Sequence, residues 1–98
     1  MKHPEDCTNI EESRRAIDAL DREVISLIGR RARYVEAAAR FKNSEQGVRA
    51  PERQREMLAQ RRRWAEEAGL DPDVIEGIYR TLVSYFVDRE MKGWREAR

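Results

Sequence analysis

The chain has 98 residues, enough for one domain but not for two. Charged residues make up 40% of it and hydrophobic residues another 40%, with only five Gly and three Pro, and this composition favours helices. Lys plus Arg is 20 and Asp plus Glu is 19, which gives a net charge of +1. Because the two signs are interleaved along the chain, a basic surface for nucleic acid is not expected.

Single residues and short runs exclude further classes of protein. One cysteine, Cys7, cannot form an internal disulfide or a zinc site, which favours a reducing compartment. The only histidine, His3, lies in the N-terminal tail, and the basic run 61–63 is interpreted as a solvated helix face. No apolar run approaches the roughly 18 residues of a membrane span, and the N-terminal MKHPEDCTN has no apolar core segment. We therefore expect a cytoplasmic protein without a membrane partner.

The first predicted helix is unusually long and covers residues 9–42. Thr8 with Glu11, or Asn9 with Glu12, fits a capping box at its start. At about 1.5 Å per residue the helix would be roughly 50 Å long, against roughly 30–35 Å for the diameter of a compact globule of this chain length. A lone helix of that length would leave apolar surface bare, so we expect a homodimer in which the long helices pack together.

Two more helices are predicted after a turn-like stretch, NSEQGVRA. The second covers 51–68 and begins at Pro51, because the missing N–H of proline is not needed in the first helical turn. The third covers 72–94, with Asp71 as its N-cap. The sequence thus predicts one all-α domain over residues 1–98.

One face of the first helix mixes apolar residues with cations. Alternating steps of four and three residues along it pass through Ile10, Arg14, Ile17, Asp21, Val24, Ile28, Arg31, Val35, Ala38 and Lys42. Drift of the helix against a strict heptad, or long cationic stems that cover apolar surface, would explain this without a ligand. If the cations lie inside, Asp21 alone cannot neutralise three of them, and buried unpaired ions are costly. A bound dicarboxylate would then supply the missing charge, which suits the planar fork of arginine.

The third helix extends an apolar row with a carboxylate. Tyr79, Val83, Phe86 and Glu90 share one face, so Glu90 is either an edge carboxylate in a salt bridge, with Lys92 or an arginine, or a functional group that donates a hydrogen bond when protonated. No catalytic Ser-His-Asp or Cys-His set, glycine-rich phosphate loop or metal-ligand cluster can be assembled. An enzyme of this composition would hold an anion and stabilise charge in the transition state, and we expect neither metal nor cofactor.

Several residues are spaced as in the all-helical chorismate mutase family, which the chain resembles over nearly its whole length: Arg14, Arg31, Lys42, the APER of residues 50–53 and Glu90. The N-terminal PEDC, the RFK of residues 40–42 and the RWAEEAGLD of residues 63–71 look closest to one branch, the isochorismate pyruvate lyases of salicylate and siderophore synthesis. The resemblance implies an intertwined homodimer of three-helix chains and a pericyclic reaction without a covalent intermediate.

The resemblance also implies roles for individual residues. Lys42 approaches the ether oxygen of an enolpyruvyl-ether substrate, and Glu90 donates a hydrogen bond to the same oxygen. Arg31 and Arg14 clamp the two substrate carboxylates, with Arg14 supplied by the partner subunit. The remaining implied contacts are Arg53 near the site and an apolar wall of Met57, Phe86 and Val87.

Departures from the family pattern leave the substrate open. Ala50 and Gln54 stand where many mutases carry the Asp and Glu that recognise the ring hydroxyl of chorismate, which favours isochorismate. Phe86 replaces a small hydroxyl residue and enlarges the apolar wall, whereas Glu90 in place of Gln favours the mutase. The resemblance therefore implies cleavage of isochorismate to salicylate and pyruvate. Rearrangement of chorismate to prephenate is the alternative or a side activity, and a non-catalytic helical dimerisation module is the second alternative.

Overall fold

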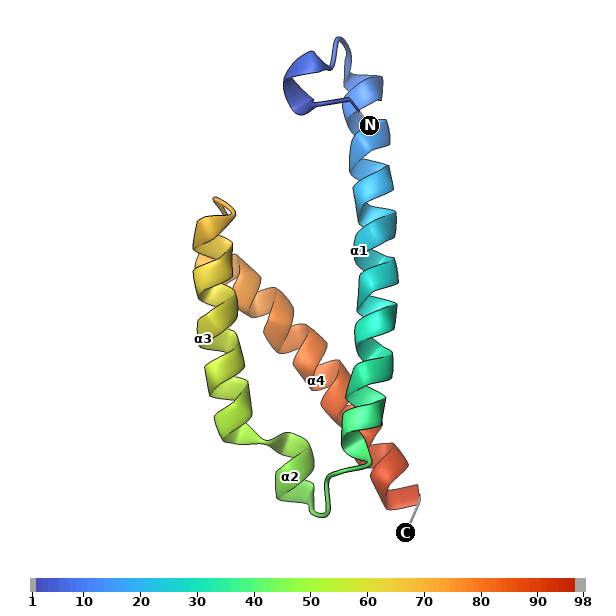
Figure 1. Ribbon diagram of the computed structural model, residues 1–98, viewed down its shortest axis with the longest axis vertical. Coiled ribbons are helices and arrows are strands. Elements are labelled where there is room, and N and C mark those ends of the chain that lie inside the picture. Colours follow the sequence, from blue (N-terminus) through green and yellow to red (C-terminus); the bar gives the residue numbers. More distant parts are fainter. Residues whose placement is uncertain (1, 97–98) are drawn as a thin grey trace. The chain divides into compact units, whose positions relative to one another are not determined.

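The computed structural model describes residues 2–96 (Figure 1). A short 3-10 helix, η1 (Pro4–Asp6), precedes four α-helices: α1 (Ile10–Ala39), α2 (Glu45–Arg49), α3 (Pro51–Glu67) and α4 (Pro72–Glu96). This range contains no strand, which confirms the predicted all-α fold. Residues up to Tyr34 form one compact unit, and those from Val35 onward form a second. Across residues 2–96, every helix is either too short or too polar to cross a membrane.

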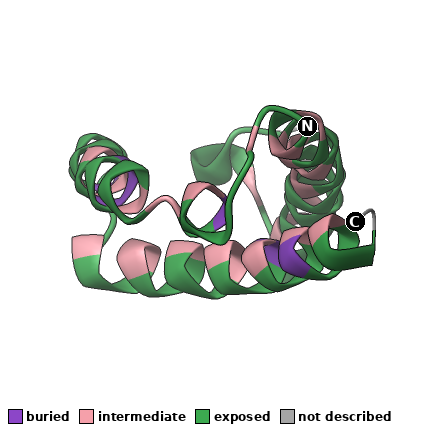
Figure 2. Cartoon of the chain, turned by 90° about the horizontal axis from the view of Figure 1, so that it is seen from below, coloured by how far each residue is buried: buried purple, intermediate pink, exposed green. Residues whose placement is uncertain are grey.

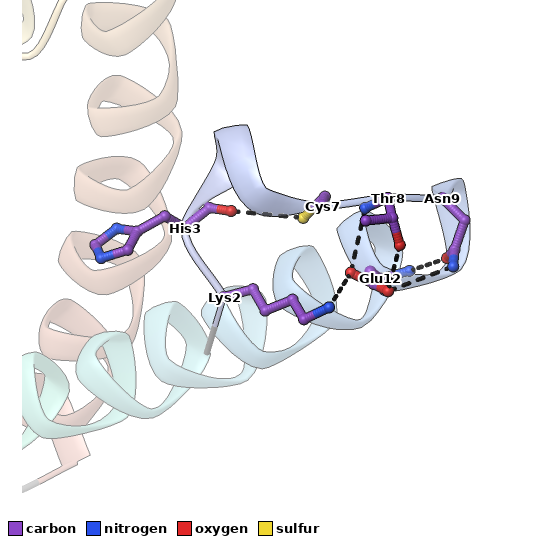
Figure 3. Close-up of polar contacts among 6 residues, drawn as sticks. All are labelled: Lys2, His3, Cys7, Thr8, Asn9 and Glu12. Atoms are coloured by element: carbon purple, nitrogen blue, oxygen red, sulfur yellow. Dashed lines mark hydrogen bonds and ion pairs between the residues drawn. The ribbon is translucent and has the colours of Figure 1, made fainter.

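Polar side chains fix the start of α1 within the first unit (Figure 3). The backbone N–H of Glu12 donates to Asn9 Oδ1 at 2.9 Å, so Asn9 with Glu12 is the capping pair. The Glu12 carboxylate also accepts hydrogen bonds from Lys2 Nζ and Thr8 Oγ1, both at 2.8 Å. These contacts, led by that of Lys2, hold the pKa of Glu12 below its ordinary value.

The apolar residues of α1 are largely exposed. None of its described residues is buried, and seven large hydrophobic side chains are between 49% and 74% exposed: Ile10, Ile17, Leu20, Val24, Ile25, Leu27 and Tyr34. Exposed large apolar side chains in this number along one helix are typical of an interface.

The first helix is shorter at its C-terminal end than predicted. It ends at Ala39 rather than at Lys42, because the N–H groups of residues 40–42 each donate to the carbonyl three residues earlier, at 3.1–3.2 Å. This tighter turn closes the helix and satisfies its last carbonyl groups. Lys42 therefore lies in the connection to α2 and not on a helix.

The turn between α3 and α4 follows the predicted signals. Gly69 has a φ of 76°, and Leu70 N–H donates to the carbonyl of Ala65 at 2.8 Å, which is a Schellman ending. Asp71 then accepts a hydrogen bond from the N–H of Asp73 at 2.9 Å and caps α4. Helices α3 and α4 agree with the predicted ranges to within two residues.

The core of the second unit lies between α2, α3 and α4. Its buried residues are Val48, Met57, Leu58, Ala65, Phe86 and Met91, and buried positions are coloured purple in Figure 2. Helices α2 and α3 both pack against α4. The turn-like stretch 43–50 thus contains a helix that the sequence analysis missed, because its five residues are too few for a periodic pattern.

The basic run at residues 61–63 is only partly a solvated helix face. The half-buried Arg61 guanidinium lies 4.6 Å from the ring centroid of Trp64 and 5.6 Å from that of Tyr79, so it packs by cation–π contact between α3 and α4. Arg62 donates to Asp73 Oδ1 at 2.9 Å, and the third residue of the run is exposed. The run therefore contributes to helix packing.

Candidate active site

An ion pair between Lys42 and Glu90 lies at the centre of the candidate site. Lys42 Nζ donates to Glu90 Oε2 at 2.8 Å, and their side chains are 24% and 6% exposed. Charge-assisted hydrogen bonds of this length are among the stronger polar contacts in proteins. The pair joins the connection after α1 to α4, across 48 residues of sequence.

A pocket of about 290 Å³ borders the carboxylate end of this pair, lined by Val35, Glu36, Ala39, Phe86, Arg89, Glu90 and Gly93. Val35, Ala39 and the buried Phe86 give it an apolar side. A longer ion pair, Arg89 with Glu36 at 3.5 Å, joins α4 to the end of α1 among the lining residues. The pocket thus combines apolar surface with two carboxylates and one arginine.

The expected apolar wall does not form one surface. Phe86 lines the pocket beside Glu90, whereas Val87 lines a second pocket of about 270 Å³ together with Gln54. Met57 is only 3% exposed and belongs to the core, where it cannot offer a surface to a ligand in this conformation. The reason is the helix period: residues 86 and 87 of α4 point about 100° apart.

The three arginines expected to contact the substrate lie in different parts of the structure. In the first unit, Arg14 is exposed and pairs with Glu11 at 3.5 Å, and Arg31 is half-buried on α1. In the second unit, Arg53 is exposed in the first turn of α3. Ala50, the residue directly before α3, is the N-cap of that helix and has a φ of 42°. The clamp of Arg14 and Arg31 therefore remains a prediction.

The partner of Glu90 differs from those expected for an edge carboxylate. The structure pairs it with Lys42 and not with Lys92 or an arginine. An ionised carboxylate only accepts hydrogen bonds, whereas an ammonium group has three donors. With one donor used by Glu90, Lys42 keeps two more for a ligand. The pair can therefore present an oriented cation, while its carboxylate borders the pocket.

Two further ion pairs of the second unit escaped the sequence analysis. They are Glu36 with Arg89 and Glu45 with Arg95, and each joins residues at least 50 positions apart. Neither lies in a motif, and no periodic pattern links such distant partners. Across residues 2–96, His, Cys, Asp and Glu side chains form no group of three that could hold a metal ion.

Comparison with known proteins agrees with this helical architecture. A family model described as chorismate mutase type II matches residues 13–91. A Pseudomonas aeruginosa protein named isochorismate pyruvate lyase is 46% identical over 98 residues, which is 100% of this chain and 97% of that protein. The T-proteins of Haemophilus influenzae and Enterobacter agglomerans are 39% and 36% identical over 76% and 68% of this chain, but the matches span only 20% and 18% of those proteins. The resemblance inferred from the sequence is thus confirmed, and the chain belongs to the chorismate mutase type II family.

Proposed function

We propose that the protein is an isochorismate pyruvate lyase, which cleaves isochorismate to salicylate and pyruvate. The observation that carries the proposal is the Lys42–Glu90 pair, whose carboxylate borders a pocket of apolar and charged residues, in a chain that matches a protein of that name over its full length. In this reaction the ether C–O bond breaks and the ring becomes aromatic. A ring hydrogen must reach the enolpyruvyl methylene carbon, which becomes the methyl group of pyruvate.

Lys42 is proposed to stabilise the negative charge that grows on the ether oxygen as the C–O bond breaks. An oriented donor in a partly dry site stabilises such charge far more than one in water does. The 2.8 Å contact with Glu90 supports this role, because it fixes the ammonium group before substrate arrives. Glu90 is proposed to donate to the same oxygen when it is protonated and to orient Lys42 when it is ionised.

Arg14 and Arg31 are proposed to bind the two carboxylates, with Arg14 from the partner subunit. The exposed apolar residues of α1 support a homodimer, since a second copy of the same helix would cover them. Arg53, Met57 and Val87 stay in the proposal as substrate contacts, with Met57 and Val87 requiring movement of the α3–α4 packing. The lone Cys7 supports a cytoplasmic location.

Rearrangement of chorismate to prephenate is the alternative activity. It is favoured by the family description and by Glu90, while Ala50 and Gln54 favour isochorismate. Both substrates carry two carboxylates and an enolpyruvyl ether, so one clamp can serve both. A non-catalytic helical dimer is the second alternative, and it predicts no turnover of either substrate.

Incubation of the protein with each substrate tests the proposal. We expect salicylate fluorescence to rise with isochorismate, and a slower loss of chorismate absorbance. Turnover of chorismate alone would replace the lyase with the mutase, and turnover of neither would favour the non-catalytic dimer. Light scattering should give twice the chain mass of 11.6 kDa, and an active monomer would contradict the trans role of Arg14.

A further inference from the structure

The position of Lys42 needs an explanation, because the helix that precedes it ends at Ala39. A long flexible side chain on an irregular connection would not by itself hold its ammonium group in one place. Lys42 nevertheless lies within 2.8 Å of Glu90. Residues 43–49, which follow it, include α2, which lies beside the lysine stem at Gly47 and packs against α4.

The first attachment is local and depends on Ser44 and Gly47. Ser44 Oγ accepts a hydrogen bond from the N–H of Gly47 at 3.0 Å and caps α2. A Cβ atom built on Gly47 would lie 3.3 Å from Ser44 Oγ and 3.7 Å from the Cβ of Lys42. Gly47 of α2 thus lies beside the stem of Lys42, with room for no more than about a methyl group between them, so a displacement of α2 changes the support of the lysine.

The second attachment joins α2 to α4. Val48 is only 1% exposed, and α2 packs against α4. Glu45, the first residue of α2, accepts hydrogen bonds from Arg95 Nη2 at 2.9 Å and Arg95 Nε at 3.3 Å. A helix of five residues is not stable alone, so these contacts must hold it in place.

Both ion pairs, Lys42–Glu90 and Glu45–Arg95, therefore join residues 42–45 to α4. Lys42 and Glu45 are three residues apart, and their partners Glu90 and Arg95 are five residues apart along α4. The polarity is reversed between them, so turning residues 42–45 end for end along α4 would place Lys42 opposite Arg95 and Glu45 opposite Glu90, both like-charge contacts. This arrangement fixes both the register and the orientation of Lys42.

We propose that Glu45 and Arg95 are positioning residues, which hold α2 against α4 and so aim Lys42 at the reacting oxygen. This inference rests on the proposed function for its effect on rate. The Glu45 and Arg95 side chains are 51% and 60% exposed, so their ion pair adds little to global stability. Its loss should instead loosen the connection and misplace Lys42.

The test uses Glu45→Gln, Arg95→Gln and the double variant, with Arg62→Gln as the matched control. Arg62 forms an ion pair of the same length with Asp73, near the start of α4. We expect each single variant to lower kcat about tenfold, within the roughly 10²-fold that a 1 Å misplacement can cost. KM should change by less than about threefold, because the proposed carboxylate clamp is untouched. The control should keep the wild-type kcat.

Two readouts separate a positioning role from a general structural one. The double variant should be no slower than the slower single variant, since both changes break one contact. Hydrogen exchange measured by mass spectrometry should accelerate by up to about fivefold in segment 43–50 and remain unchanged in α3. These amides include that of Ala50, which donates to the carbonyl of Gln46 at 2.7 Å.

Three results would overturn the proposal: wild-type kcat in both single variants, losses that multiply in the double variant, or faster exchange that is as large in α3 as in segment 43–50. If the wild-type protein turns over neither substrate, the proposed function fails. Hydrogen exchange then still decides whether Glu45 and Arg95 hold the connection.

Discussion

Replacing Lys42 with Ala should damage both stability and catalysis, and the structure sets the size of each effect. The change leaves the Glu90 carboxylate, with a side chain only 6% exposed, without its hydrogen-bond donor. Removing one partner of a buried ion pair costs about 3–5 kcal/mol in the free energy of unfolding. Because this pair is only part-buried, with the Lys42 side chain 24% exposed, we expect less than this range, about 1–3 kcal/mol.

Changing the other partner of the pair, Glu90, should lower the free energy of unfolding less. The two variants can therefore be compared with each other. In Glu90→Gln the group left behind is the lysine, whose long stem lets the ammonium group reach water. We therefore expect Lys42→Ala to lower the free energy of unfolding more than Glu90→Gln does. The double variant should recover part of the loss, since it leaves no unpaired charge. Urea titrations at one protein concentration measure all three.

The catalytic effect of Lys42→Ala should be larger still. Loss of one preorganised electrostatic contact typically lowers kcat by about 10²–10³. Salicylate fluorescence with isochorismate measures the rate, and Lys92→Ala, which changes an exposed lysine of α4, is the control. A Lys42→Ala protein that keeps more than a tenth of the wild-type rate would refute the catalytic role. Equal destabilisation by Lys42→Ala and Glu90→Gln would refute the reasoning from burial.

Three other changes test separate parts of the account. Glu90→Gln supplies a permanent hydrogen-bond donor to the ether oxygen, so its kcat should be at least equal to that of the wild type; a slower variant would exclude Glu90 as the donor. Mixing inactive Arg14→Ala and Lys42→Ala chains should restore activity, because a heterodimer regenerates one complete site; no recovery would place Arg14 in cis or outside the site. The hydrogen bond from Arg80 holds the pKa of Glu76 below its ordinary value of 4.5. That contribution to stability is present above pH 4.5 and lost as the pH falls further, so Glu76→Gln should flatten the acid side of the urea-unfolding profile, and an unchanged profile would show that the contact contributes nothing.

Most helix boundaries could be predicted because they depend on local chemistry. Asn9 and Asp71 act as N-caps through their own side chains, and Pro51 lies at the first position of α3. Such signals operate over two to four residues and do not require the rest of the fold. The C-terminal end of α1 lacked a signal of this kind, since neither glycine nor proline follows Ala39. Its i−3 hydrogen bonds could not be predicted from apolar spacing.

The candidate site was only partly predictable for a related reason. The resemblance indicated Lys42 and Glu90 individually, and the structure adds that they form an ion pair. The partners are 48 residues apart, so their contact depends on how the connection after α1 packs on α4. Glu45 and Arg95 were missed because two surface charges 50 residues apart carry no local signal.

The Lys42–Glu90 pair also changes the charge argument that pointed to a dicarboxylate. On the first helix alone, three cations faced one anion, Asp21, and a doubly charged ligand was needed to balance them. In the structure Glu90 supplies an anion from the same chain, so Lys42 is already neutralised before a ligand arrives. A substrate carboxylate must therefore compete with Glu90 for this cation, while an ether oxygen can use a remaining donor without displacing it. The ion pair consequently favours Lys42 as the group that contacts the breaking bond, and it leaves Arg14 and Arg31 as the proposed carboxylate ligands.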